Sequence, residues 1–194
     1  MRIESSVTSL SWIPLGAMEG AGTELAFRFG IAHYDPPPPE VLEDLEALKA
    51  ADRFRFANVL RAWIEADDDG RIADYGHAGG GQIGSTTMRL GSRELTFAAM
   101  PFPDLRPKPE IGDGWVRFVQ TAGGRTGAPA PRRIRRPPFV QWIAPAAWST
   151  LALTIHADGT AEPRLVGASS FPRHWVYDHT GRLVAKSGYI DHDT

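Results

Sequence analysis

The chain has 194 residues, 42% of them hydrophobic and 23% charged, a composition typical of one soluble globular domain. Its net charge of −2 argues against nucleic-acid binding by the molecule as a whole. Because cysteine is absent, disulfides, thiolate metal sites and cysteine catalysis are excluded. No apolar run approaches the ~20 residues of a membrane helix, and the N-terminus lacks the pattern of a signal peptide. We therefore expect a cytoplasmic protein without a membrane partner.

The N-terminal segment predicts two strands followed by a helix. The strands are expected at residues 7–13 and 25–31. Residues 35–52 predict one amphipathic helix of about three to four turns, because prolines and acids suit a helix N-terminus. Its apolar residues recur at helical spacing and form one stripe that would lie across a sheet. They are Val41, Leu42, Leu45 and Leu48.

Most of the remaining chain predicts antiparallel hairpins. Asp-Gly, Gly-Ser and Thr-Gly turns separate runs that are rich in β-branched and aromatic residues. The expected strands are 53–65, 71–75, 86–90, 94–99, 115–120, 139–143, 151–156, 160–166, 174–177 and 182–186. About ten antiparallel strands tend to curl into a barrel or split into a sandwich. We favour an antiparallel β-barrel or strongly curled sheet, formed by residues 1–194 as a single domain.

Two irregular stretches interrupt this pattern. Residues 101–114 contain four prolines and are expected to form a loop. Residues 122–138 are rich first in glycine and then in proline and arginine, and are also expected to form a loop. A loop of about 15 residues inside a compact domain is usually functional or disordered.

The expected arrangement of many strands and one helix resembles that of lipocalin-type and other small ligand-binding barrels. The resemblance lies in the layout alone and is carried by no sequence motif. It implies an internal cavity, and it assigns no catalytic residue.

Two motifs are weak indications of cofactors. Residues 79–84 match the GxGxxG pattern of dinucleotide sites, but a β-prone run follows them instead of a helix, so a glycine-rich bulge or barrel corner is favoured. His156, Asp158 and His192 could supply a two-histidine, one-carboxylate metal site. Asp158 belongs to an Asp-Gly turn, however, so neither a metal nor another cofactor is predicted.

Four residues are candidates for acid–base chemistry without a cofactor. His174 and Tyr177 lie in the chain's densest mix of polar and aromatic groups, His33 ends an expected strand, and Arg117 is a lone charge within one. They would act as base, acid and charge stabiliser in an isomerase, cyclase or hydratase type of reaction. The alternatives are a satisfied buried histidine, structural aromatics, and an outward arginine lying over its neighbour. Whether the protein is an enzyme stays open.

Aromatic residues at strand positions suggest a ligand pocket, although they are also core material. The candidates for its lining are Trp12, Tyr34, Trp115, Trp142 and Trp175. The first functional hypothesis is therefore that a small, largely apolar molecule binds in a barrel cavity.

The second hypothesis rests on an arginine run. Arg132, Arg133, Arg135 and Arg136 stand among prolines and could clamp an anion. The run would make the chain a non-catalytic interaction protein that docks an acidic partner or forms a homodimer. A charged strand edge is the structural alternative. Nucleic-acid binding, with Phe139 and Trp142 as stacking platforms, is the weakest alternative.

Overall fold

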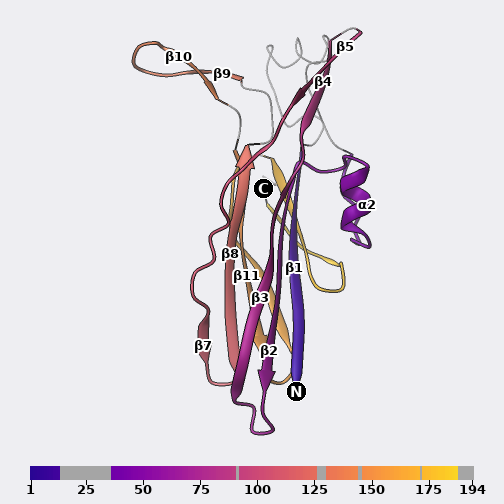
Figure 1. Cartoon of the computed structure of the whole chain (residues 1–194), viewed down its shortest axis with the longest axis vertical. Coiled ribbons are helices and arrows are strands. Elements are labelled where there is room, and N and C mark those ends of the chain that lie inside the picture. Colours follow the sequence, from indigo (N-terminus) through magenta and orange to yellow (C-terminus); the bar gives the residue numbers. More distant parts are fainter. Residues whose placement is uncertain (14–35, 91, 126–129, 144–145, 171, 188–194) are drawn as a thin grey trace, which may run out of the picture.

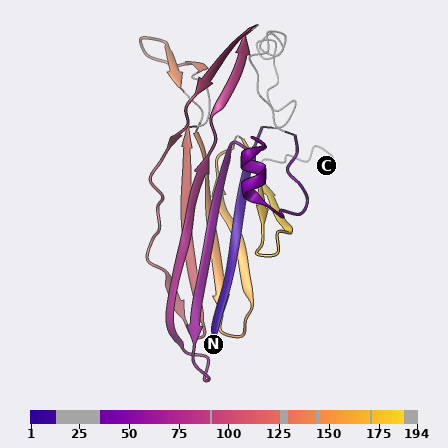
Figure 2. The ribbon, with the colours of Figure 1, turned by 45° about the vertical axis from the view of Figure 1, so that its right-hand side comes forward.

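The computed structural model describes residues 1–13, 36–90, 92–125, 130–143, 146–170 and 172–187. These residues form two antiparallel sheets that lie face to face as two layers (Figure 1, Figure 2). Sheet 1 has the order β14 (Leu183–Ser187), β13 (Arg173–Tyr177), β1 (Arg2–Trp12), β2 (Phe56–Ala66) and β3 (Ile72–Ile83). Sheet 2 has the order β12 (Ala161–Ala168), β11 (Ala146–His156), β8 (Trp115–Arg125) and β6 (Met100–Pro101), and β7 (Glu110–Gly112) also pairs with β8.

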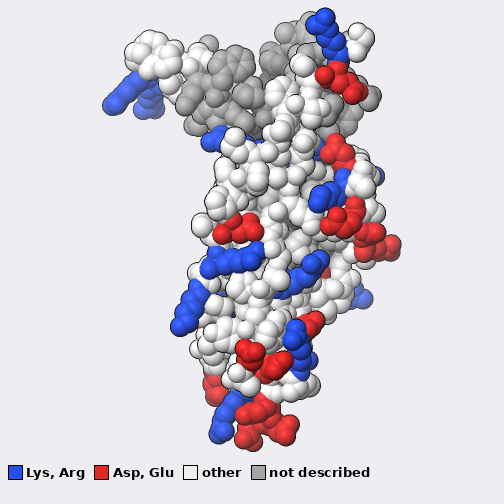
Figure 3. Space-filling model, viewed as in Figure 1, with Lys and Arg blue, Asp and Glu red and all other residues white. Residues whose placement is uncertain are grey.

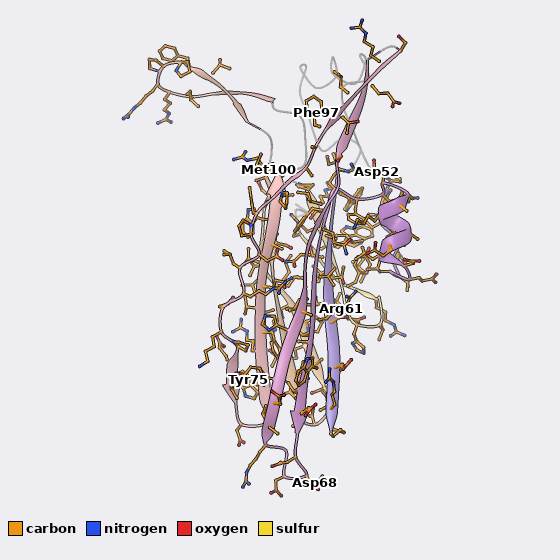
Figure 4. All side chains as sticks on the ribbon, in the orientation of Figure 1. Asp52, Arg61, Asp68, Tyr75, Phe97 and Met100 are labelled. Atoms are coloured by element: carbon orange, nitrogen blue, oxygen red, sulfur yellow. The ribbon has the colours of Figure 1, made fainter. Side chains whose placement is uncertain are left out.

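Two further hairpins extend beyond one end of the sandwich (Figure 1). They are β4 (Thr86–Leu90) with β5 (Arg93–Phe97), and β9 (Ala130–Arg133) with β10 (Val140–Ile143). The tight turn between β2 and β3, which contains Asp68, lies at the opposite end (Figure 4). The molecule is thus elongated, with its strands running between these two ends.

The core lies between the sheets, because alternate residues of each long strand point inward. Both sheets contribute fully or almost fully buried apolar side chains to one cluster. They are Val7, Leu60, Ala62, Ile64 and Val176 from sheet 1, and Val116, Phe118, Leu151, Leu153 and Ile155 from sheet 2.

The predicted barrel is wrong, since no closed barrel forms among the strands that the structure describes. Edge strand β3 faces β8 through side chains instead of backbone hydrogen bonds. The rings of Tyr75 and His77 lie 6.2 and 5.5 Å from the ring of Phe118, measured between centroids. β8 pairs with β11 along one edge and with β7, Leu105 and β6 along much of the other. These partners occupy the edge of β8 that β3 would need, so the sheets stay separate layers with the tilted rings packed between them.

The predicted long helix is also wrong: helix α2 covers only Leu45–Ala50. Asp44 is its N-cap and accepts a hydrogen bond from the amide of Ala47 at 2.9 Å. The preceding chain pairs elsewhere, because the amide of Leu42 donates to the carbonyl of Gly181 at 2.7 Å. Three of the four residues in the predicted apolar stripe still pack against the sandwich, whereas Val41 is exposed. Leu42, Leu45 and Leu48 pack against a second buried cluster that includes Leu10 and Tyr177.

Most predicted strands are confirmed, with shifts at their ends. The main differences are extensions: β1 starts at Arg2, β3 continues to Ile83, and β8 continues to Arg125. The predicted loop 122–138 therefore begins as strand and also contains β9, and the predicted loop 101–114 contains β7. The predicted strand 25–31 lies outside the described residues. No helix in the described ranges is long and apolar enough to cross a bilayer.

The glycines of the GxGxxG pattern do not form the predicted bulge. Gly79, Gly80 and Gly81 continue β3 in unbroken register with β2. Gly79 has a φ of +114°, and a Cβ built on it would lie 1.9 Å from the carbonyl oxygen of Val59. Glycine is needed at this position because of the close approach of the two strands, and the helix of a dinucleotide site is replaced by β4.

Replacing Gly79 with alanine is therefore expected to destabilise the fold. Gly159 offers a matched control: its φ is +92°, but nothing lies within 4 Å of a Cβ built there. Both variants have the backbone strain of a positive φ, and only Gly79→Ala adds a clash with backbone. In denaturant unfolding, we expect Gly79→Ala to lower the free energy of unfolding by about 1–2 kcal/mol more than Gly159→Ala does. Equal losses would show that the strand approach is not tight.

Candidate functional site

His174 of β13, the first candidate base, is completely buried between the sheets. Its Nε2 lies 3.0 Å from the backbone oxygen of Ser169, and its Nδ1 lies 2.6 Å from the Ser11 hydroxyl. Because a carbonyl oxygen only accepts, Nε2 carries the proton and Nδ1 accepts the hydroxyl hydrogen of Ser11. Burial lowers the pKa of His174 to about 4, so the ring is neutral near pH 7.

The chain Ser11–His174–Ser169 has the connectivity of a nucleophile, a base and an orienting group. Ser11 and His174 are both 0% exposed, however, which leaves a substrate no access to the hydroxyl. The Ser169 amide also donates to the carbonyl of Trp148 in β11 at 2.9 Å. His174 therefore links the two sheets, and this geometry favours a structural role.

A second buried polar group lies deeper between the sheets. The Asn58 side-chain amide of β2 donates to the backbone oxygen of Ser149 at 2.9 Å, and its Oδ1 accepts from Nε2 of Gln120 at 2.7 Å. Nε2 of Gln120 also donates to the carbonyl of Val59, and its Oε1 accepts from Nε of Arg106, both at 2.9 Å. These bonds join sheet 1 to sheet 2 and satisfy polar groups that would otherwise be costly to bury.

Tyr177 and Arg117, the other candidate acid–base residues that the structure describes, form no hydrogen bond with His174. Tyr177 is on the opposite face of β13 and donates its hydroxyl to the carbonyl of Pro39 at 2.7 Å. Burial raises the pKa of Tyr177, which keeps the phenol protonated. Arg117 points away from the core on β8 and lies 3.4 Å from the Glu110 carboxylate. The structure therefore does not bring these three residues together, and His33 lies outside the described residues.

The candidate aromatic residues do not line one pocket. Trp12 and Trp175 form an edge-to-face pair with 5.7 Å between centroids, and the Lys186 amine lies 4.3 Å over Trp175. Trp115 covers Gly112 on sheet 2, where a Cβ would lie 2.1 Å from the indole. Tyr34 and the side chain of Trp142 lie outside the described part of the chain.

The arginine run lies on the β9–β10 hairpin. Arg132 and Arg133 belong to β9, and their side chains are not among those described. Residues 135–140, which we name the hairpin tip, are all exposed, and Phe139 is 59% exposed. Neither Arg135 nor Arg136 forms an ion pair with a described residue. Figure 3 shows blue side chains at the end of this projecting hairpin.

A groove of about 320 Å³ crosses the outer face of sheet 1. Its floor includes Ser6, Arg61 and Ala78, which are cross-strand neighbours on β1, β2 and β3. Trp63 and His179 also line it. We name this feature the outer groove.

Sequence reasoning missed Asn58, Gln120 and Arg61. Asn58 and Gln120 are lone polar residues at the core parity of otherwise apolar strands, and this signal was available in the sequence. Arg61 is a lone charge in an apolar run, like Arg117, but nothing in the sequence shows its neighbours on β1 and β3. Among the described side chains, no group of three or more His, Asp or Glu could hold a metal ion.

Comparison with known proteins adds no functional assignment. No protein-family model matches the chain, and no curated protein matches it.

Proposed function

We propose that this protein is a non-catalytic binding module that docks an acidic protein partner through the hairpin tip. The observation that carries the proposal is six consecutive exposed residues, 135–140, on a hairpin that projects from the sandwich (Figure 1). Two guanidinium groups without an ion pair to any described residue, together with an exposed phenylalanine, combine charge attraction with an apolar anchor in one short segment. Arginine and aromatic residues are the types that dominate binding energy at protein interfaces.

The backbone at Phe139 supports this proposal. Phe139 has a φ of +63°, a conformation that non-glycine residues adopt rarely. A buried phenylalanine could offset this cost by packing, but Phe139 is 59% exposed. Strained, exposed residues cluster at binding sites, so the side chain fits a contact with a partner better than a role in folding.

The test is binding of a fluorescein-labelled peptide, made of glutamate with a central leucine, to the full chain. The double variant Arg135→Glu/Arg136→Glu is expected to weaken binding by at least about tenfold, since it reverses both contact charges. Affinity of the unmodified protein is expected to fall steeply between about 20 mM and about 500 mM salt. Phe139→Asn, which tolerates a positive φ, is expected to weaken binding without lowering stability.

The matched control is Lys108→Glu/Arg182→Glu, which makes the same change in net charge at two other exposed positions. If this control weakens binding as strongly as the hairpin variant, attraction is general and the proposal is wrong. Tighter binding of a single-stranded oligonucleotide than of the acidic peptide would assign the tip to nucleic acid instead. A salt-sensitive dimer that the hairpin variant dissociates would make the partner a second copy of this chain.

The binding of a small apolar molecule inside the fold stays a prediction. The side chains described between the sheets have near-zero exposure, and no observation favours a ligand among them. Native mass spectrometry, followed by denaturation of the same sample, tests this prediction directly. A released small molecule would support it, and a ligand-free mass would count against it.

A further inference from the structure

The outer groove combines positive charge with a floor formed by three neighbouring strands of sheet 1. Among its lining residues, Glu4 is the single acid, and its carboxylate is engaged by Nε of Arg2 at 2.7 Å. Arg2 also lies 3.7 Å from Glu65 and 4.2 Å over the Trp63 ring. The charge of Arg2 is therefore balanced by Glu4 in the groove wall and by Glu65 outside it.

Arg61 is different, because no hydrogen bond or ion pair of its side chain occurs with any described residue. It is exposed at mid-height of the outer face (Figure 4), and its cross-strand neighbours are Ser6 and Ala78. Neither neighbour is charged, so the guanidinium keeps all its donors for solvent or a ligand.

The groove exists because large and small residues alternate across the strands. Trp63 lies against Gly76 of β3, where any Cβ would come within 2.8 Å of the indole. The small side chains of Ser6 and Ala78 leave the space on either side of Arg61 open. The result is an open groove whose volume, about 320 Å³, falls within the range of small-ligand sites.

We propose that the outer groove binds a small organic anion, with the guanidinium of Arg61 pairing its carboxylate or phosphate group. Planar guanidinium groups match both oxyanions in a bidentate fashion. His179 and the Ser6 hydroxyl line the same groove and supply further hydrogen-bonding groups, while Trp63 and Ala78 supply apolar surface. This site is separate from the hairpin tip, which lies beyond the end of the sandwich.

The test is an NMR titration of the full chain with phenyl phosphate, inorganic phosphate and benzoate at constant ionic strength. Saturable shifts of the Arg61 Nε–H and the Trp63 indole N–H are expected, with dissociation constants on the order of 0.1–10 mM. Arg61→Gln is expected to weaken binding at least tenfold while leaving the fold intact, since the side chain is exposed. Phenyl phosphate binding more tightly than inorganic phosphate would show that the apolar surface takes part.

The matched control is Arg71→Gln, which removes an exposed arginine from the β2–β3 turn of the same sheet. The control is expected to bind phenyl phosphate as the unmodified protein does. Equal weakening by both variants, or Arg61 and Trp63 signals that do not move with any of the three anions, would overturn the proposal. Arg135→Glu/Arg136→Glu is expected to leave this titration unchanged, so the proposals for the outer groove and for the hairpin tip are tested independently of each other.

Discussion

Acidification is expected to cost the protein about 3 kcal/mol of folding free energy through His174 alone. Burial holds the pKa of this histidine at about 4 in the folded state, whereas its ordinary value is 6.5. The unfolded chain therefore binds a proton that the folded chain excludes between these two values. Stability contributed by the neutral ring is fully present above pH 6.5, falls as the pH drops, and is lost below about pH 4.

The measurement compares urea unfolding of the unmodified protein with His174→Gln across this pH range. Glutamine can still donate to the Ser169 carbonyl and accept from Ser11, but it does not titrate. Other groups, such as Asp158 with its pKa lowered by the Thr160 hydroxyl, are common to both proteins and cancel in the difference. Identical pH dependence in the two proteins would mean that His174 is not buried as the structure shows.

Replacing either Asn58 or Gln120 with an apolar residue is expected to lower the free energy of unfolding by about 3 kcal/mol. The remaining partner then has a buried polar atom that has lost the hydrogen bond between the two side chains. Asn58→Leu leaves Nε2 of Gln120 with one acceptor fewer, and Gln120→Leu strands Oδ1 of Asn58. The double variant removes both partners, so its loss is expected to be smaller than the sum of the single losses by about 1–2 kcal/mol.

A control cycle uses Thr121 and Thr150, whose hydroxyls lie 2.7 Å apart on the outer face of sheet 2. Both are half-buried, so water can replace a lost partner, and their valine variants are expected to show coupling below about 0.5 kcal/mol. Additive losses at Asn58 and Gln120 would mean that the two sheets are not joined by this bond. Denaturant unfolding of the four proteins in each cycle measures the coupling.

Local patterns predicted most of the strands because hairpins are encoded by short-range signals. Asp158-Gly159 and Thr180-Gly181 lie at or beside turns that join neighbouring antiparallel strands, as the sequence predicted. The long helix failed for a non-local reason. Leu42 has helical spacing, but its amide bonds to Gly181, and a distant strand connection competes successfully with a local helix.

The candidate site shows the same division. Alternation on β13 placed His174 and Val176 on one face and Trp175 on the other, which the structure confirms. Parity alone does not say which face is the core. On β8 the core face is that of Val116 and Phe118, so Arg117 points outward beside Glu110. Strand alternation already places Tyr177 on the opposite face of β13 from His174, whereas the outward orientation of Arg117 was decided by the packing of the sheets.

By itself, the sequence determined that this protein is mainly β, that its strands pair as hairpins, and that arginines concentrate between residues 132 and 136. Turn chemistry and period-two alternation are local properties, and they need no knowledge of distant contacts. Only the tertiary structure decided that β8 has partners on both edges, which keeps the sheets from joining through β3, and that the hairpin tip projects from them. It also decided that Arg61 lies in a groove between Ser6 and Ala78, with no ion pair to a residue in the described ranges. These features depend on strand order and on which sheet face is covered, and both are set by long-range packing.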